Sequence, residues 1–250
     1  MTHMLYSLAN NFKAVTGVFN NAVYVTTMKI GSITFAEQME DVHYLNQDNF
    51  LPQIYKYFEN PDIEKHVNLF IRDPFQRYIS GVIQNTLDFD STASVSTHLT
   101  YFGKSLLFHN DIRILSTVEL IKREHSNWFL NGLPEEYEDI IINLLKLYYK
   151  ESAVFELYLD PHVQPFLTPI NKLLVNSKIN FKTLFLQDFN WRMSSTKLKE
   201  TRHSNKSFKK VAIEAFNQAN NEILINMIKS ETFTYSHLVH LREDLNTDYI

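Results

Sequence analysis

Two apolar runs of this chain each end at a short polar turn, and a helical pattern follows each turn. The runs, rich in β-branched and aromatic residues, are 22–27 and 67–71, and a third run is 181–186. Such runs are typical of buried strands. Strands that alternate with helices indicate an α/β fold with a mainly parallel central sheet flanked by helices. Ligands bind beyond the carboxyl ends of such strands, so both turns are expected to face one crevice.

Helical patterns occupy much of the remaining chain. They predict helices over 33–39, after Pro74, and over 94–108, 116–130 and 135–150. The last predicted helix begins near Ser207, a favourable N-cap residue, and keeps an apolar i+4 stripe as far as Met227. Apolar residues at helical spacing also predict a short surface helix within about 1–20. No linker, repeat or low-complexity tract marks a boundary, so residues 1–250 are expected to form a single domain.

Composition excludes several classes of protein. The 250 residues are 44% hydrophobic and 14% aromatic, which is too apolar for a disordered chain. The formal net charge is −4, so no nucleic-acid partner is expected. Without cysteine, the chain has neither disulfides nor thiolate metal sites. No stretch has the length and apolarity of a membrane span or signal peptide, which predicts a soluble, cytoplasmic or otherwise intracellular protein. The sequence leaves the oligomeric state open.

The first polar turn combines a glycine, a cation and two hydroxyls. Gly31 permits a positive φ or the close approach of a ligand. Lys29 adds a full positive charge, and Ser32 and Thr34 add hydroxyl groups. The N–H groups that open the following helix can hold an anion. The turn is therefore a candidate anion site, and its alternative is an ordinary turn with a solvated lysine.

The second polar turn contains two arginines. Arg72 leaves the end of a buried strand, where a guanidinium needs an anionic partner. Ser80 lies two helical turns into the following helix, so its hydroxyl is expected to share a flank with Arg72. Arg77 is expected to stabilise the loop. The alternative is a surface cluster of Arg72 and Asp73, with Arg77 on a solvated face.

In this order, the two turns resemble motifs of the sulfotransferases that use 3′-phosphoadenosine 5′-phosphosulfate (PAPS), most of all the carbohydrate sulfotransferases. The motifs are K-x-G-[ST] after the first strand and R-D-P-F-x-R-Y-x-S after a later one. The resemblance implies a P-loop-like sulfotransferase architecture. It implies that Lys29 contacts the bridging oxygen of PAPS, and that Gly31, Ser32 and nearby backbone amides hold the 5′-phosphate. Arg72 and Ser80, eight residues apart as the family pattern requires, would bind the 3′-phosphate.

Two later segments extend the resemblance. Residues 160–165 resemble a block in the middle of many carbohydrate sulfotransferases, and residues 202–207 resemble their late H-x-N-x-S segment. The second segment is basic and carries hydroxyls, so it would close over the nucleotide. Its candidate binding residues are Arg202, Asn205, Lys206 and Ser207.

Sulfuryl transfer moves a charged SO₃ group between two oxygens, and its catalysis rests on positioning and charge stabilisation. Lys29 would stabilise the charge that develops on the leaving oxygen. The acceptor hydroxyl, expected on a carbohydrate, needs a base, and imidazole accepts protons near neutral pH. His162 is the first candidate and His43 the second; for each, the alternative is a structural or surface role. This chemistry requires no metal.

Two other functions remain open. Met28 and Ile33 depart from the family pattern in the first turn, which leaves a catalytically inactive nucleotide-binding or scaffold protein of the same fold as one alternative. The other is a nucleotide-dependent kinase. The five glycines of the chain form neither of the common Gly-rich nucleotide motifs, and no acidic magnesium ligand is evident, so the sequence favours this alternative less.

Overall fold

The computed structural model describes residues 12–27, 30, 32–86, 112–151, 163–185 and 206–247. The backbone contacts group the chain into two compact units. The first unit comprises Met1–Arg77, Gln164–Ser195 and Met227–Ile250, and the second comprises Tyr78–Val163 and Thr196–Asn226. The expectation of one domain over 1–250 stays a prediction.

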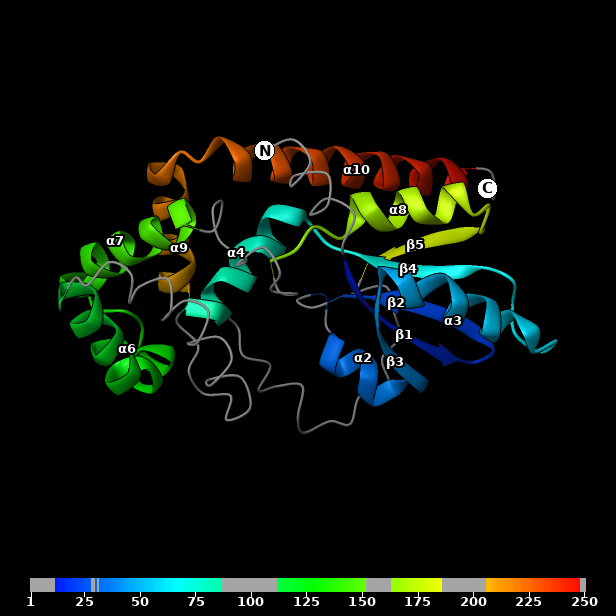
Figure 1. Cartoon of the computed structure of the whole chain (residues 1–250), viewed down its shortest axis with the longest axis horizontal. Coiled ribbons are helices and arrows are strands. Elements are labelled where there is room, and N and C mark those ends of the chain that lie inside the picture. Colours follow the sequence, from blue (N-terminus) through cyan, green and yellow to red (C-terminus); the bar gives the residue numbers. More distant parts are fainter. Residues whose placement is uncertain are drawn as a thin grey trace. The chain divides into compact units, whose positions relative to one another are not determined.

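A five-stranded sheet with the order β3-β1-β2-β4-β5 forms the centre of the first unit (Figure 1). The strands are β1 (Lys13–Phe19), β2 (Ala22–Thr26), β3 (Glu40–Asn46), β4 (Val67–Ile71) and β5 (Phe181–Phe185). β1 is antiparallel to β2 and β3, whereas the pairs β2–β4 and β4–β5 are parallel. The three predicted strands and the α/β class are confirmed, but the sheet is mixed rather than mainly parallel.

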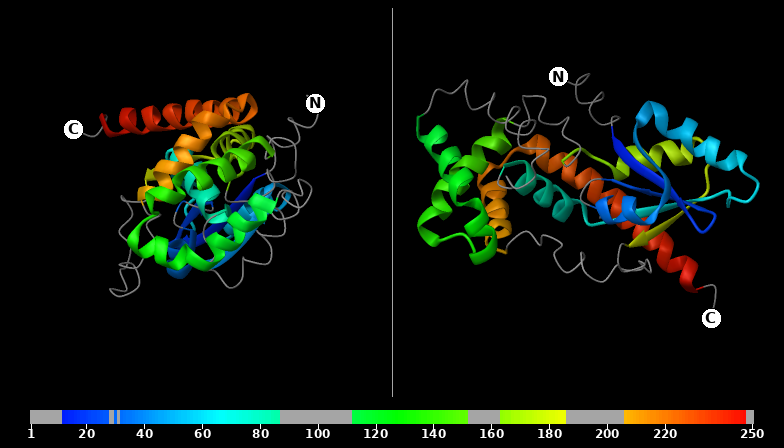
Figure 2. Two further views of the ribbon diagram at one scale, coloured as in Figure 1. Left: turned by 90° about the vertical axis from the view of Figure 1, so that its left-hand side faces the viewer. Right: turned by 90° about the horizontal axis from the view of Figure 1, so that it is seen from below.

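β1 replaces part of the surface helix that was predicted within about 1–20. Asn20 and Asn21 join β1 to β2 with φ values of 47° and 61°, the left-handed values that a two-residue type I′ hairpin turn requires. The right-hand view of Figure 2 shows this hairpin in blue. The helical spacing of Phe12 and Val15 was misleading because four consecutive residues of β1 are buried, two on each face of the sheet. Residues 1–11 lie outside the described residues.

Helices cover both faces of this sheet. Met39, which follows α2 (Ser32–Gln38), packs closely against Gly17 of β1. A Cβ added to Gly17 would lie only 2.7 Å from the Met39 Cβ. α3 (Gln47–Glu59) contacts the neighbouring residue of β1, because the Tyr57 hydroxyl lies 3.2 Å from Thr16 Oγ1. Since adjacent residues of a strand point to opposite faces, α2 and α3 lie on opposite faces. The predicted helix at 33–39 is confirmed, but both of its ends lie one residue earlier in the chain.

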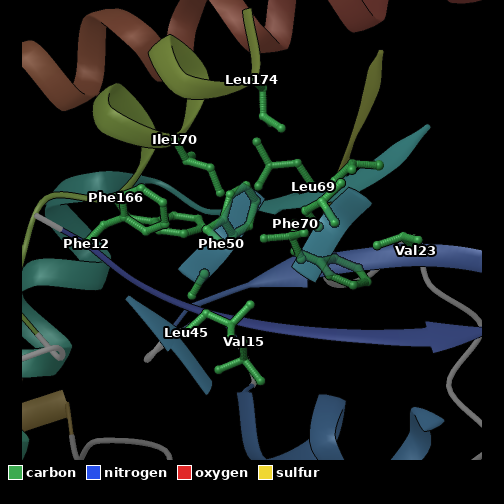
Figure 3. Packing of buried hydrophobic residues seen from close by; sticks show 14 of the residues in the cluster. Phe12, Val15, Val23, Leu45, Phe50, Leu69, Phe70, Phe166, Ile170 and Leu174 are labelled. Atoms are coloured by element: carbon green, nitrogen blue, oxygen red, sulfur yellow. The ribbon is translucent and has the colours of Figure 1, made fainter. Parts of the chain in front are cut away.

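The main core of the first unit lies on the α3 face. Phe12 contacts Phe50 of α3 and Phe166, which precedes α8 (Leu167–Asn176), with ring centroids 5.5 and 6.2 Å apart. Figure 3 shows these rings beside Ile170 and Leu174 of α8. α10 (Glu222–Thr247) lies on the same side as α8 in Figure 1 and adds Leu238 to this core.

The described part of the second unit is helical. It contains most of α4 (Pro74–Thr86) together with α6 (Ile112–Asn131), α7 (Glu135–Glu151) and α9 (Lys206–Ala219). α7 packs against α9, where the buried Tyr149 hydroxyl donates to the Ala212 carbonyl at 2.9 Å. The Tyr149 ring also contacts Tyr78 and Phe216. The predicted helices at 116–130 and 135–150 are confirmed, and the one at 94–108 lies outside the described residues.

The last predicted helix is in fact two helices. Asn220 adopts a φ of 45°, in the left-handed region that commonly ends helices, and so ends α9. Asn221 Oδ1 accepts hydrogen bonds from the N–H groups of Ile223 and Leu224 at 3.1 and 3.3 Å, which caps α10. A continuous stripe to Met227 was therefore wrong, because apolar spacing carries no sign of a two-residue break.

Candidate functional site

The turns after β2 and β4 emerge at one edge of the sheet. The two strands are neighbours and parallel, and their register pairs Val25 with Leu69. The chain therefore leaves β2 after Thr26 and β4 after Ile71 at the same edge. This carboxyl edge is where open α/β sheets bind ligands.

The first predicted turn is described only at its flanks. Thr27 Oγ1 donates to the Lys13 carbonyl at 2.6 Å, so β1 begins at the carboxyl edge. Lys29 and Gly31 lie outside the described residues. α2 begins at Ser32 and includes Thr34, and the side chains of these two residues are likewise outside the described part of the structure.

Lys13 is a cation of this edge that the sequence analysis missed. Its side chain is exposed, and its backbone carbonyl accepts the hydrogen bond from Thr27. A helix was predicted for this region, and a helix gives no reason to place Lys13 beside the end of β2. The Asn20-Asn21 dipeptide was the available signal, because it predicts the hairpin that returns β1 to this edge.

Arg72 is the first residue after β4 and is partly buried. Burial lowers the pKa of its guanidinium, whereas the charge of Asp73 raises it. Asp73 Oδ1 accepts from the Gln76 N–H at 2.7 Å and so caps the first turn of α4. Arg72 is thus a partly desolvated cation beside a helix N-terminus, and both features favour an anionic ligand.

Arg77, in the first turn of α4, is buried. It is 5% exposed, and its Nη2 donates to the Gln164 carbonyl. Among the described residues, its Nε finds no hydrogen-bond partner. Burial lowers the pKa of Arg77 to about 10; the charge of Glu231 opposes this shift and that of Arg72 adds to it. Because Arg77 is buried, the alternative of a solvated face is wrong, whereas the expected stabilisation of the loop by its side chain stays a prediction.

Glu231 of α10 is a buried carboxylate at the N-terminus of α8. Its two oxygens accept hydrogen bonds from the N–H groups of Phe166, Leu167 and Thr168, each at 2.8 Å. Charge-assisted bonds and the helix dipole both stabilise a carboxylate there. Glu231 was not predicted from the sequence, because its partners lie more than 60 residues away. The available signal was its position in the helical spacing of the buried Leu224 and Leu238.

Ser80 is the residue that the motif pairs with Arg72. It is partly buried on α4. Arg72 belongs to the first unit and Ser80 to the second.

His43 lies on β3, away from the carboxyl edge. It pairs with Thr16, three residues along β1 from Lys13, which is about 10 Å at the usual rise of a strand. The structure therefore does not bring His43 to the edge from which Arg72 emerges. His162, the first candidate base, lies outside the described residues.

The surroundings of His43 suit a structural role. Its Nε2 lies 2.9 Å from Asp41 Oδ1, and its ring centroid lies 6.2 Å from that of Tyr57. Asp41 has a φ of 48°, and the Tyr57 hydroxyl donates to its carbonyl at 2.7 Å. His43 is thus a partner of an irregular strand segment, next to a bulge in the β1–β3 pairing.

The late basic segment is described only from Lys206 onward, so Arg202 and Asn205 lie outside the described residues. Lys206 is exposed and is the first residue of α9. Ser207 was predicted as the N-cap, which is wrong because the helix begins one residue earlier. Its Oγ instead accepts a hydrogen bond from the Leu133 N–H at 2.9 Å.

None of the described helices is both long enough and apolar enough to cross a membrane. Within the described ranges, no three His, Asp or Glu side chains gather closely enough to hold a metal ion. Comparison of the chain with protein-family models, with curated proteins and with solved structures finds no match.

Proposed function

We propose that the protein is a sulfotransferase with a P-loop-like architecture that moves a sulfuryl group from PAPS to an acceptor hydroxyl on a carbohydrate. One observation carries the proposal: β2 and β4 are parallel neighbours, so the chain leaves both strands at the same sheet edge. A doubly phosphorylated adenosine needs a cationic site for each of its phosphate ends. The motif residues that follow these two strands supply a lysine and an arginine.

The 3′-phosphate is assigned to the turn after β4. Arg72 offers a planar fork of donors that matches phosphate oxygens, and its partial burial strengthens each charge-assisted bond. The resemblance assigns the hydroxyl of Ser80 to the same phosphate. Asp73 already caps α4 through the Gln76 N–H, so its carboxylate is held by the helix.

The 5′-phosphosulfate is assigned to the turn after β2. Lys29 contacts the oxygen that bridges phosphorus and sulfur, Gly31 lets the backbone approach closely, and the first N–H groups of α2 hold the 5′-phosphate with Ser32 and Thr34. The arrangement of a strand, a turn and a helix N-terminus supports this assignment.

In the reaction, the acceptor oxygen attacks sulfur and forms a new S–O bond as the bond from sulfur to the bridging oxygen breaks. The acceptor proton passes to a base, for which His162 is the first candidate. The departing oxygen becomes part of the 5′-phosphate of adenosine 3′,5′-bisphosphate, and Lys29 stabilises the charge that it gains.

The late basic segment would cover the bound nucleotide with Arg202, Asn205, Lys206 and Ser207. Ser207 Oγ accepts a hydrogen bond from the Leu133 N–H at 2.9 Å, and the resemblance assigns its hydroxyl to the nucleotide. Exposed Lys206 at the start of α9 supplies the charge.

The proposal is tested by incubating the protein with PAPS and a panel of glycans and measuring the release of adenosine 3′,5′-bisphosphate. We expect acceptor-dependent release that Lys29→Ala lowers at least about 100-fold, the loss seen when a key charge-stabilising group is removed. The matched control is Lys56→Ala on exposed α3 surface, which should leave the rate unchanged.

Two results would contradict the proposal. Binding of the bisphosphate without turnover on any acceptor would favour the inactive nucleotide-binding alternative. Equal losses in the Lys29 and Lys56 variants would remove the role of the first turn.

A further inference from the structure

A buried cation and a buried anion hold the same segment beside the turn that contains Arg72. Arg77, in the first turn of α4, contacts residues 164–168 through the Gln164 carbonyl. Glu231 of α10 contacts the same residues through three N–H groups at the start of α8. Three pieces of the first unit that are remote in sequence therefore depend on these two side chains.

The charges of this group act on one another. Arg72 is close enough to Arg77 to lower its pKa, and Glu231 raises that pKa. Burial and then the charge of Asp73 raise the pKa of Tyr235, one helical turn after Glu231 on α10.

Arg77 connects the segment that Glu231 holds to the turn that contains Arg72. Its buried guanidinium donates to the Gln164 carbonyl, two residues before the first N–H group that Glu231 binds. Its backbone N–H donates to the carbonyl of Asp73 at 3.0 Å, and Asp73 directly follows Arg72. A displacement of residues 164–168 would therefore be transmitted through Arg77 to this turn.

We infer that Glu231 is a positioning residue of the 3′-phosphate site: by holding the N-terminus of α8, next to the carbonyl that Arg77 binds, it keeps Arg72 oriented toward the phosphate. The inference rests on the proposed function, since it names a residue that acts behind the same site. It extends that function from the motif turns to α10, which contains none of the sequence motifs.

The test measures a 3′-phosphate preference, defined as the Kd of adenosine 5′-phosphate divided by the Kd of adenosine 3′,5′-bisphosphate. Glu231→Gln is expected to lower this preference roughly 10- to 100-fold, the size of effect that a displaced positioning group produces. Glu222→Gln is the matched control, because Glu222 is exposed on the same helix. It should leave the preference unchanged.

The outcomes separate the inference from the proposed function. A merely structural Glu231 would lower the melting temperature of the variant and leave the preference unchanged. Simple removal of a negative charge would tighten bisphosphate binding and raise the preference. Either result would overturn the inference while the proposed function stands. A native protein with no preference for the bisphosphate would overturn both.

A second variant covers the case in which Glu231→Gln does not fold. Arg77→Lys keeps the buried charge but replaces the guanidinium fork by a single ammonium group. The inference predicts a reduced 3′-phosphate preference in this variant as well. An unchanged preference in folded Arg77→Lys would contradict it.

Discussion

At the scale of single residues, Tyr57 stabilises an irregular strand segment. Its hydroxyl donates to the Asp41 carbonyl at 2.7 Å and lies 3.2 Å from Thr16 Oγ1, and the residue is 3% exposed. Asp41 has a φ of 48°, which is costly for a residue other than glycine. The hydroxyl therefore compensates a local backbone strain.

Tyr57→Phe should lower the free energy of unfolding by about 1–3 kcal/mol, because it leaves the buried Thr16 hydroxyl and the Asp41 carbonyl without this partner. Tyr55→Phe is the matched control on the same helix, since Tyr55 is 47% exposed. Urea denaturation of the three proteins measures the difference. Equal stability of the two variants would contradict the role of the Tyr57 hydroxyl.

Tyr149 gives a prediction for alkaline pH. Burial raises the pKa of Tyr149 well above its ordinary value, and its hydroxyl donates to the Ala212 carbonyl. The unfolded chain releases this proton near pH 10 while the native protein retains it, so this contribution to stability is full below about pH 10 and is lost as pH rises further.

Tyr149→Phe should therefore cost about 1–3 kcal/mol at neutral pH, and its difference from the native protein should shrink as pH rises from about 9 to about 11. Melting temperatures across this range measure the effect. A difference that stays constant or grows with pH would contradict the assigned direction of the pKa shift.

Among the site residues, local sequence predicted Arg72 and Arg77 but not Glu231. A polar turn after an apolar strand is visible within ten residues of sequence. The bonds of Glu231 join positions 63 to 65 residues apart, and only the fold shows such a contact. The turn was predicted because it is local, whereas the bond of Arg77 to the Gln164 carbonyl spans 87 residues and, like those of Glu231, is visible only in the fold.

At the scale of helices and strands, the junction of α9 and α10 depends on Asn221. Its Oδ1 caps α10, and its Nδ2 donates to the Tyr149 carbonyl at 2.8 Å. Asn220 contributes mainly a backbone conformation, with a φ of 45°. Two adjacent asparagines thus have different roles.

Asn221→Ala should destabilise the protein by about 1–2 kcal/mol, the usual cost of a lost cap. Asn220→Gly should change stability by at most a few tenths of a kcal/mol, because glycine adopts a positive φ without strain. Thermal unfolding of both variants checks this contrast. A larger loss from Asn220→Gly would reverse the two roles.

The elements that sequence patterns predicted are those with one dominant signal. β2 and β4 are short apolar runs, and α7 begins with three acidic residues that suit the helix dipole. β1 and β3 were not predicted, because neither strand alternates buried and exposed residues in a simple way. β1 has buried residues on both faces of the sheet, and a bulge interrupts its pairing with β3. Both of these strands are antiparallel, and this explains why a mainly parallel sheet was expected.

At the scale of the whole molecule, the proposed binding site depends on the order of the strands in the sheet. Sequence patterns predicted the strands that precede the two motif turns, whereas their parallel adjacency comes from the sheet itself. The antiparallel strands β1 and β3 extend the sheet on the far side of β2 and do not disturb this pair. The two motif turns therefore lie at the same carboxyl edge of the sheet, although β1 and β3 were not predicted.

The most direct test is a calorimetric titration of three ligands: adenosine 3′,5′-bisphosphate, adenosine 3′-phosphate and adenosine 5′-phosphate. Arg72→Ala should weaken the two ligands that carry a 3′-phosphate by at least about tenfold, or about 1.4 kcal/mol, and leave adenosine 5′-phosphate nearly unchanged. Lys29→Ala should do the same for the two ligands that carry a 5′-phosphate and spare adenosine 3′-phosphate. Native protein that binds none of the three, or variants that weaken all three equally, would contradict two separate cationic turns at one sheet edge.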